Sequence, residues 1–84
     1  MLRIAMVGDH GCIRVIKESL ALKARGHWVE IINRQEPFGY NRFDRVTLWH
    51  DRDQLIRAVR DSRADIVHVH NEPDWIVSAA REGT

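Results

Sequence analysis

Polar residues gather at the ends of two apolar segments that are far apart in the sequence. The first group follows the apolar run Ile4–Val7, and the second ends the segment Asp65–His70. The candidate substrate-binding residues in these groups are Asp9, His10, Gly11, His70, Asn71 and Glu72. Carboxylate, imidazole and amide groups hydrogen-bond to hydroxyl and phosphate groups. The two groups therefore predict a site for a hydroxylated or phosphorylated ligand, provided that the fold brings them together.

Two glycines, Gly8 and Gly11, flank Asp9 and His10 in a G-x-x-G turn. Glycine permits positive φ and close backbone approach, and the helix that follows offers unpaired N–H groups to an anion. The spacing is neither the dinucleotide fingerprint G-x-G-x-x-G nor the phosphate-binding loop with its lysine. An anion site and a plain structural turn both remain compatible with this segment.

The histidines of the second group alternate along a predicted strand. His68 and His70 share a face because strand side chains alternate with a period of two, so both face one pocket or one helix. His68 stands among valines, which favours a core histidine with a satisfied hydrogen bond, whereas His70 stands at the strand end and suits ligand contact. Glu72 also suits the N-terminus of the next helix, whose positive end attracts carboxylates.

A metal site built from His10, Cys12, His70 and Glu72 is chemically competent, because zinc binds these side chains. No C-x-x-C or H-x-x-x-H spacing enforces their convergence, so we expect no metal and no cofactor. No Ser-His-Asp arrangement is evident, and Cys12 with His10 is too slight a basis for a nucleophile and its base. The sequence identifies no catalytic residue.

Alternating apolar and amphipathic segments predict the elements that position these groups. The predicted strands are Ile4–Val7, Trp28–Ile32, Val46–Trp49 and Asp65–His70. A helix from Ile13 ends at Gly26, a second follows a cap at Asp51 or Asp53, and a third begins at about Asp74. The segment 34–42 contains Pro37 and Gly39 and is a long loop, of the kind that often carries function. We expect Trp28, Trp49 and Trp75 to pack in the core or against helices rather than to form a sugar platform.

This order of elements predicts an α/β fold with a Rossmann-like parallel sheet of about four strands and flanking helices. Right-handed crossovers place the strands in the order 3-2-1-4. The connection between strands two and three is short for a parallel crossover, so an antiparallel third strand is the alternative. The fourth strand becomes an exposed apolar edge, which favours an incomplete domain, residues 1–84 being the first part of a Rossmann-like domain, or a homo-oligomer through that edge.

Composition excludes several classes of protein. The chain has 84 residues, of which 44% are hydrophobic and 30% charged, as in ordinary globular proteins. The 13 basic and 12 acidic residues are interspersed and leave a net charge of +1, so we expect no nucleic-acid partner. The single cysteine, Cys12, allows no intrachain disulfide, and no leader or spanning segment is evident, which favours a cytoplasmic protein.

Three segments resemble the N-terminal domain of the family 4 retaining glycosyltransferases, which have two Rossmann-like domains (the GT-B fold). These segments are Arg3–Gly8, Ala21–Ile32 and Ala64–Glu72, the last carrying the most specific pattern, A-D-I-V-H-x-H. The resemblance spans nearly the whole chain apart from the 34–42 loop. It departs from the family in the first loop, which is compact here, and in the family's catalytic-region histidine after a fifth strand, which this chain lacks.

The resemblance implies that this domain holds a sugar or phosphorylated acceptor, with Gly11 and His70 lining the cleft. A C-terminal domain outside this chain would bind the nucleotide-sugar donor, so the isolated chain is expected to be inactive. Two other hypotheses stay open. One is a non-catalytic binding or assembly module that uses the exposed strand edge. The other is a metal- or cobalamin-binding module, suggested by the segment Gly8–Gly11.

Overall fold

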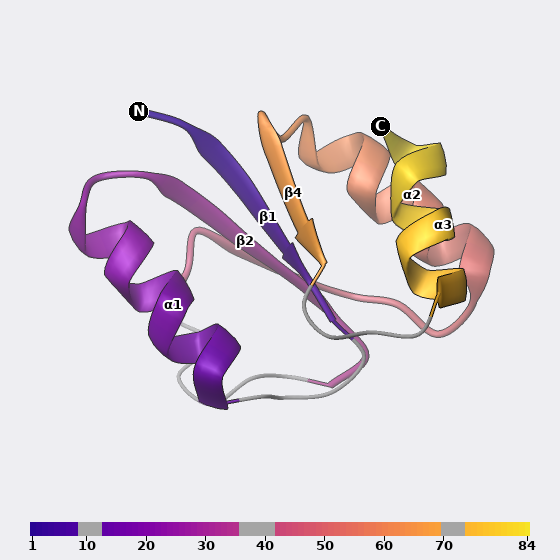
Figure 1. Cartoon of the computed structure of the whole chain (residues 1–84), viewed down its shortest axis with the longest axis horizontal. Coiled ribbons are helices and arrows are strands. Elements are labelled where there is room, and N and C mark those ends of the chain that lie inside the picture. Colours follow the sequence, from indigo (N-terminus) through magenta and orange to yellow (C-terminus); the bar gives the residue numbers. More distant parts are fainter. Residues whose placement is uncertain (9–12, 36–41, 70–73) are drawn as a thin grey trace.

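The computed structural model of the protein describes residues 1–8, 13–35, 42–69 and 74–84 (Figure 1). Helices and strands alternate along these residues except at one point, where two strands follow each other directly. The elements are β1 (Arg3–Val7), α1 (Ile13–Ala24), β2 (Trp28–Asn33), β3 (Arg45–Leu48), α2 (Arg52–Ser62), β4 (Ile66–Val69) and α3 (Asp74–Gly83).

The strands form one parallel four-stranded sheet in the order β3-β2-β1-β4. This arrangement confirms the predicted α/β Rossmann-like fold, the strand order 3-2-1-4 and the parallel orientation of the third strand. Val7 of β1 lies opposite Ile32 of β2 and Val69 of β4. The strands are parallel, so their carboxyl ends meet at one edge of the sheet.

All four predicted strands differ from the structure by a residue at one end or both, since β1 also includes Arg3 and β2 also includes Asn33. β3 begins at Arg45 and ends at Leu48, so Trp49 follows the strand instead of closing it. β4 spans Ile66–Val69, and His70 lies outside the described residues. Asp65, predicted to begin β4, precedes the strand, and its carboxylate accepts a hydrogen bond from the Arg3 N–H.

Helices cover both faces of the sheet, α1 on one side and α2 with α3 on the other (Figure 1). Strand side chains alternate between two hydrophobic clusters. The cluster under α1 is built from Ile4, Met6, Val29, Ile31 and Phe43, with Ile16 and Leu20 of the helix packed against it. The cluster under α2 and α3 includes Ala5, Val7, Ile32, Trp49, Leu55, Val59, Ile76 and Ala79. None of the helices in the described ranges is long and apolar enough to span a bilayer.

The helix ends follow from single residues. Gly26 has a φ of +88° and ends α1, with the N–H of Gly26 bonded to the carbonyl of Lys23 and the N–H of His27 to that of Leu22. These two bonds form a Schellman motif, for which glycine is the preferred residue. Asp51 is the N-cap of α2, since its carboxylate accepts a hydrogen bond of 2.8 Å from the Gln54 N–H.

Each outer strand is joined to its inner neighbour by an aspartate that stands immediately before it. The Asp44 N–H donates to the Val29 carbonyl (3.0 Å), and its carboxylate accepts from the Val29 N–H (2.7 Å). Asp65 makes the same pair of bonds with Arg3, at 2.7 and 2.8 Å. These aspartates set the register of β3 and β4 where each strand starts.

The aspartate before β3 also binds α1. Lys23 donates to both oxygens of the Asp44 carboxylate, at 2.9 and 2.7 Å. Burial raises the pKa of Asp44, but the bonds from Lys23 and the Val29 N–H outweigh it and leave the pKa below its usual value. This carboxylate therefore ties β2, β3 and the end of α1 together at a connection that has no crossover helix in its described residues.

His68 does not belong to the core. Val67 and Val69 pack partly against the cluster under α2 and α3, so the alternate residues of β4, Ile66 and His68, face the α1 side. His68 is exposed there and Ile66 is 47% exposed, because α1 covers β1 and β2 but stops short of β4. The expectation of a core histidine at position 68 was wrong, whereas the expected exposed edge at the fourth strand is confirmed.

Candidate functional site

The residues that the sequence placed in the site lie outside the described residues. They are Asp9, His10, Gly11, His70, Asn71 and Glu72, together with Cys12. The strands before them are described, and β1 and β4 pair directly and end at the same edge. Their role in binding stays a prediction.

Five described residues meet at this carboxyl edge, and we call them the carboxyl-edge cluster. They are Gly8, Asn33, Arg34, Trp49 and Trp75. The Gly8 N–H donates to the Ile32 carbonyl (2.9 Å), and the Gly8 carbonyl accepts from the indole N–H of Trp49 (3.2 Å). The Trp49 backbone N–H donates to the Asn33 carbonyl (3.1 Å). Trp49 is fully buried and thus joins the ends of β1, β2 and β3.

An arginine lies over two tryptophans on the α2 and α3 side of this edge. The Trp49 and Trp75 rings meet edge to face, with centroids 5.6 Å apart and an interplanar angle of 84°. The Arg34 guanidinium carbon lies 4.6 Å from the Trp49 centroid and 5.9 Å from that of Trp75. An arginine over an aromatic face is held by cation–π attraction, which orients its donors. Arg34 and Trp75 are both exposed, so this part of the cluster is open to solvent.

Asn33 ends β2 on the opposite side of the edge. Its side chain is 4% exposed, and its Nδ2 donates to the Gln35 carbonyl at 2.9 Å. Its Oδ1 is buried and has no hydrogen-bond partner among the described residues. A buried acceptor that lacks a donor costs about 1–3 kcal/mol.

Arg34 and Trp75 suit a small ligand that carries an anion beside a ring. Arginine binds phosphate and carboxylate through paired N–H donors, and a half-exposed indole offers an apolar surface to a ring. In parallel α/β sheets, ligands bind outside the carboxyl ends of the strands. The cluster lies at that edge, beside the ends of β1 and β4 that the sequence had indicated.

Sequence reasoning missed the functional potential of Asn33 and Arg34, and it assigned the tryptophans to packing. That assignment holds for Trp49, which is buried, but Trp75 is 39% exposed. A signal was present, since Asn33, Arg34 and Trp49 stand at the ends of predicted strands two and three. The sequence prediction considered only the ends of the first and fourth strands, because the winding of the sheet reverses between them.

The described part of the chain contains no group of three or more histidine, cysteine, aspartate or glutamate side chains that could hold a metal ion. The alternative zinc ligands His10, Cys12, His70 and Glu72 lie outside it.

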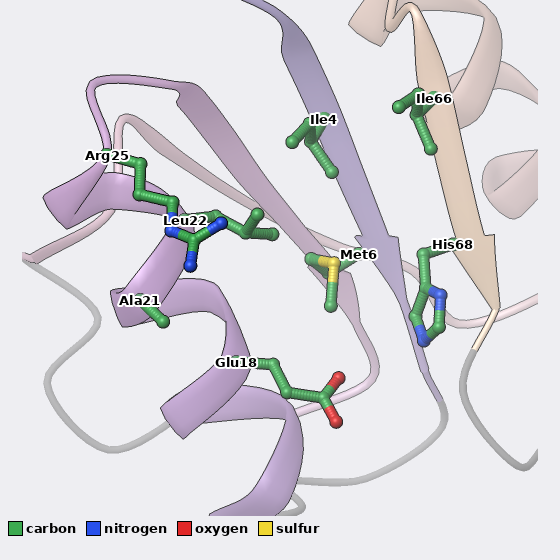
Figure 2. Close-up of a pocket in the computed structure, with 8 residues that line it drawn as sticks. All are labelled: Ile4, Met6, Glu18, Ala21, Leu22, Arg25, Ile66 and His68. Carbon is green, nitrogen blue, oxygen red and sulfur yellow. The ribbon is translucent and has the colours of Figure 1, made fainter.

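A hollow of about 420 Å³ lies between α1 and β4, apart from the carboxyl-edge cluster (Figure 2). Its floor consists of Ile4 and Met6 of β1 with Ile66 and His68 of β4, and most of its wall is apolar. Figure 2 shows Glu18 and Arg25 toward opposite ends of the hollow. It lies over a face of the sheet rather than at the carboxyl edge, so we treat it as a separate surface.

Comparison of the chain with protein-family models, with curated proteins and with solved structures gave no match.

Proposed function

We propose that the chain binds a sugar or phosphorylated acceptor at its carboxyl edge, as the acceptor side of an enzyme that transfers a sugar from a nucleotide-sugar donor. The donor would be held by a part of the enzyme outside this chain. By itself the chain would bind the acceptor without catalysing transfer. The single cysteine supports a cytoplasmic setting for this enzyme.

The observation that carries the proposal is Arg34 over the Trp49–Trp75 pair. This arginine is oriented before any ligand arrives, so little conformational entropy opposes its binding to a phosphate. The half-exposed indole of Trp75 adds an apolar surface for a sugar ring beside this arginine. Sugar phosphates carry both an anion and a ring, which is why we favour them over a plain anion.

The three tryptophans provide a direct test. Trp49 and Trp75 belong to the carboxyl-edge cluster, whereas Trp28 begins β2 at the opposite end of the sheet, under the Arg3 guanidinium at 3.8 Å. In a ¹⁵N-labelled chain, glucose 6-phosphate should shift the indole N–H signals of Trp49 and Trp75 and leave that of Trp28 in place. Glucose and inorganic phosphate, titrated separately, should each bind more weakly than the sugar phosphate.

A matched pair of variants locates the anion. Arg34→Gln should weaken glucose 6-phosphate binding by about tenfold or more, because a hydrogen bond to a charged group contributes about 1.5–3 kcal/mol. Arg57→Gln removes the same charge from an exposed position on α2 and should leave binding unchanged. Equal binding by both variants, or an equal shift of all three indole signals, would show that the ligand does not bind at this edge.

Transfer chemistry has its own test. The 84-residue chain, incubated with a nucleoside-diphosphate sugar and a bound acceptor, should release no nucleoside diphosphate above background. Measurable transfer would overturn the view that the donor side lies outside the chain.

A further inference from the structure

The outer edge of β4 presents backbone groups in a self-complementary pattern. β4 is the last strand of the sheet, and among the described strands it pairs only with β1. The Leu2 carbonyl and the Gly8 N–H bond to β2, so the odd-numbered residues of β1 face β4. With Ala5 opposite Val67, these residues bond to Ile66 and His68. The N–H and carbonyl groups of Val67 therefore point away from the sheet.

Little in the side chains protects this edge. Natural edge strands often carry lysines, inward charges or prolines that prevent pairing with another strand. β4 reads Ile66-Val67-His68-Val69 and has none of these. Ile66 is 47% exposed, although it stands in a strand of apolar neighbours.

Hollows lie on both faces of β4. Ile66 and His68 line the hollow of about 420 Å³ on the α1 side (Figure 2). Val67 and Val69 line another of about 500 Å³ on the α3 side, next to Val77, which is 39% exposed. An occupant that reaches both hollows along one edge must present side chains alternately to the two sides. A β-strand has that property.

We propose that this occupant is β4 of a second copy of the chain, paired antiparallel about a twofold axis at Val67. Val67 of each copy then exchanges two backbone hydrogen bonds with Val67 of the other, which satisfies its outward N–H and carbonyl groups. The two Val67 residues form a hydrogen-bonded pair with Cα atoms about 5.5 Å apart. The two sheets become one, and the twofold makes the interface isologous.

Charge complementarity favours an antiparallel second copy. On the α1 side, Arg25 lies toward the start of β4 and Glu18 toward its end (Figure 2). Neither side chain has an ion pair among the described residues. The twofold turns the second copy end for end, so that the Arg25 end of each hollow adjoins the Glu18 end of the other. A net charge of only +1 adds little repulsion between copies.

The dimer leaves the carboxyl-edge clusters accessible. Because the paired β4 strands run in opposite directions, the two carboxyl edges face opposite ways. Dimerisation and ligand binding are therefore separate properties, and each can fail without the other.

Disulfide trapping tests the proposed register. In a Cys12→Ser background, Val67→Cys should form a disulfide-linked dimer on mild oxidation, because a Cα separation of about 5.5 Å lies within the range of disulfides. Leu48→Cys in the same background is the matched control. Leu48 is 39% exposed on β3, the strand at the other edge of the sheet, and should give no dimer. Equal trapping at both positions, or none at Val67, overturns the proposal.

Sedimentation of the unmodified chain tests the association itself. The wild-type chain should be a discrete dimer that dissociates on dilution. Val67→Pro removes the N–H that points outward and leaves the bonds to β1 intact, and edge strands tolerate proline at such positions. Its dimer dissociation constant should rise by about tenfold or more. A wild-type chain that stays monomeric up to millimolar concentration, or forms only polydisperse aggregates, contradicts a dimer through β4.

Discussion

Glu30 is a fully buried carboxylate in the middle of the sheet, and its replacement tests how the β2–β3 pair is stabilised. Its Oε2 accepts a 2.6 Å hydrogen bond from the Thr47 hydroxyl and lies 3.3 Å from the Nε of Arg45. Its Oε1 is also buried and has no hydrogen-bond partner among the described residues. The Arg45 side chain is 45% exposed, so water solvates that cation whether or not Glu30 is present.

These contacts set the expected magnitudes. Glu30→Met removes an unsatisfied buried oxygen, which is worth about 1–3 kcal/mol. It loses a half-exposed ion pair worth about 0–1 kcal/mol and one hydrogen bond of about 1 kcal/mol. The free energy of unfolding should therefore change by between about −1 and +2 kcal/mol. Thr47→Val should lower it by about 1.5–3 kcal/mol, because the buried carboxylate loses its shortest hydrogen bond.

The double variant separates the two effects. With methionine at position 30 the Thr47 hydroxyl has no carboxylate to bind, so Thr47→Val should then cost little. The two substitutions should be coupled by about 1.5–3 kcal/mol in a double-mutant cycle. Thr84→Val makes the same chemical change at an exposed position beyond α3 and should leave stability unchanged.

Urea unfolding at pH 7, followed by tryptophan fluorescence, measures the free energy of unfolding of the wild type and of each variant. Each kcal/mol should also move the Tm by about 4–8 °C in a domain of this size. If Thr47→Val costs the same in both backgrounds, the hydroxyl stabilises the sheet by some route other than Glu30. If Glu30→Met lowers stability by more than about 2 kcal/mol, the carboxylate is a net stabilising group and the reasoning is refuted.

Two further substitutions test the packing and the aspartate before β3. Because the pKa of Asp44 is lowered in the folded chain, its stabilisation is full above the unfolded value near 3.8 and is lost as the pH falls through the folded value. Asp44→Asn should therefore cost about 1 kcal/mol at pH 7, and this cost should disappear as the pH falls through the folded pKa, measured by urea unfolding from pH 7 downward; a cost independent of pH would exclude the charge as its cause. A Cβ at Gly83 would lie 2.7 Å from both the Ile56 carbonyl oxygen and the Val59 Cβ, so Gly83→Ala should lower stability by about 1–3 kcal/mol through the contact of α3 with α2. An unchanged Tm for Gly83→Ala would show that the end of α3 is not held against α2.

The order of the elements and of the strands could be predicted because local patterns carry that information. Apolar runs, the glycine after α1 and the aspartate before α2 each act within a few residues, and crossover handedness does the rest. The direction of β3 was harder to predict, because a short connection allows either orientation. Asp44 supports the parallel one through bonds to Val29 and Lys23, which lie 15 and 21 residues away.

The candidate site could be predicted only as a place. The ends of β1 and β4 were recognised from their polar residues, and the structure confirms that these two strands end side by side. The cluster at that edge depends on contacts between distant segments, such as the bond from Trp49 to Gly8 across 41 residues. No spacing in the sequence encodes such a bond, because it exists only after β3, β2 and β1 have aligned.

The sequence by itself determined an α/β sheet, its strand order and the edge at which its first and fourth strands end, because hydrophobic periodicity and turn residues act locally. Tertiary structure decided which face each side chain takes and what covers it. His68 has the sequence context of a core residue, yet it is exposed because α1 does not extend over β4. Glu30 is a charged residue in a predicted strand, where solvent exposure would be usual, yet it is buried beside Thr47. Burial depends on the elements that pack over a strand, and these come from elsewhere in the chain.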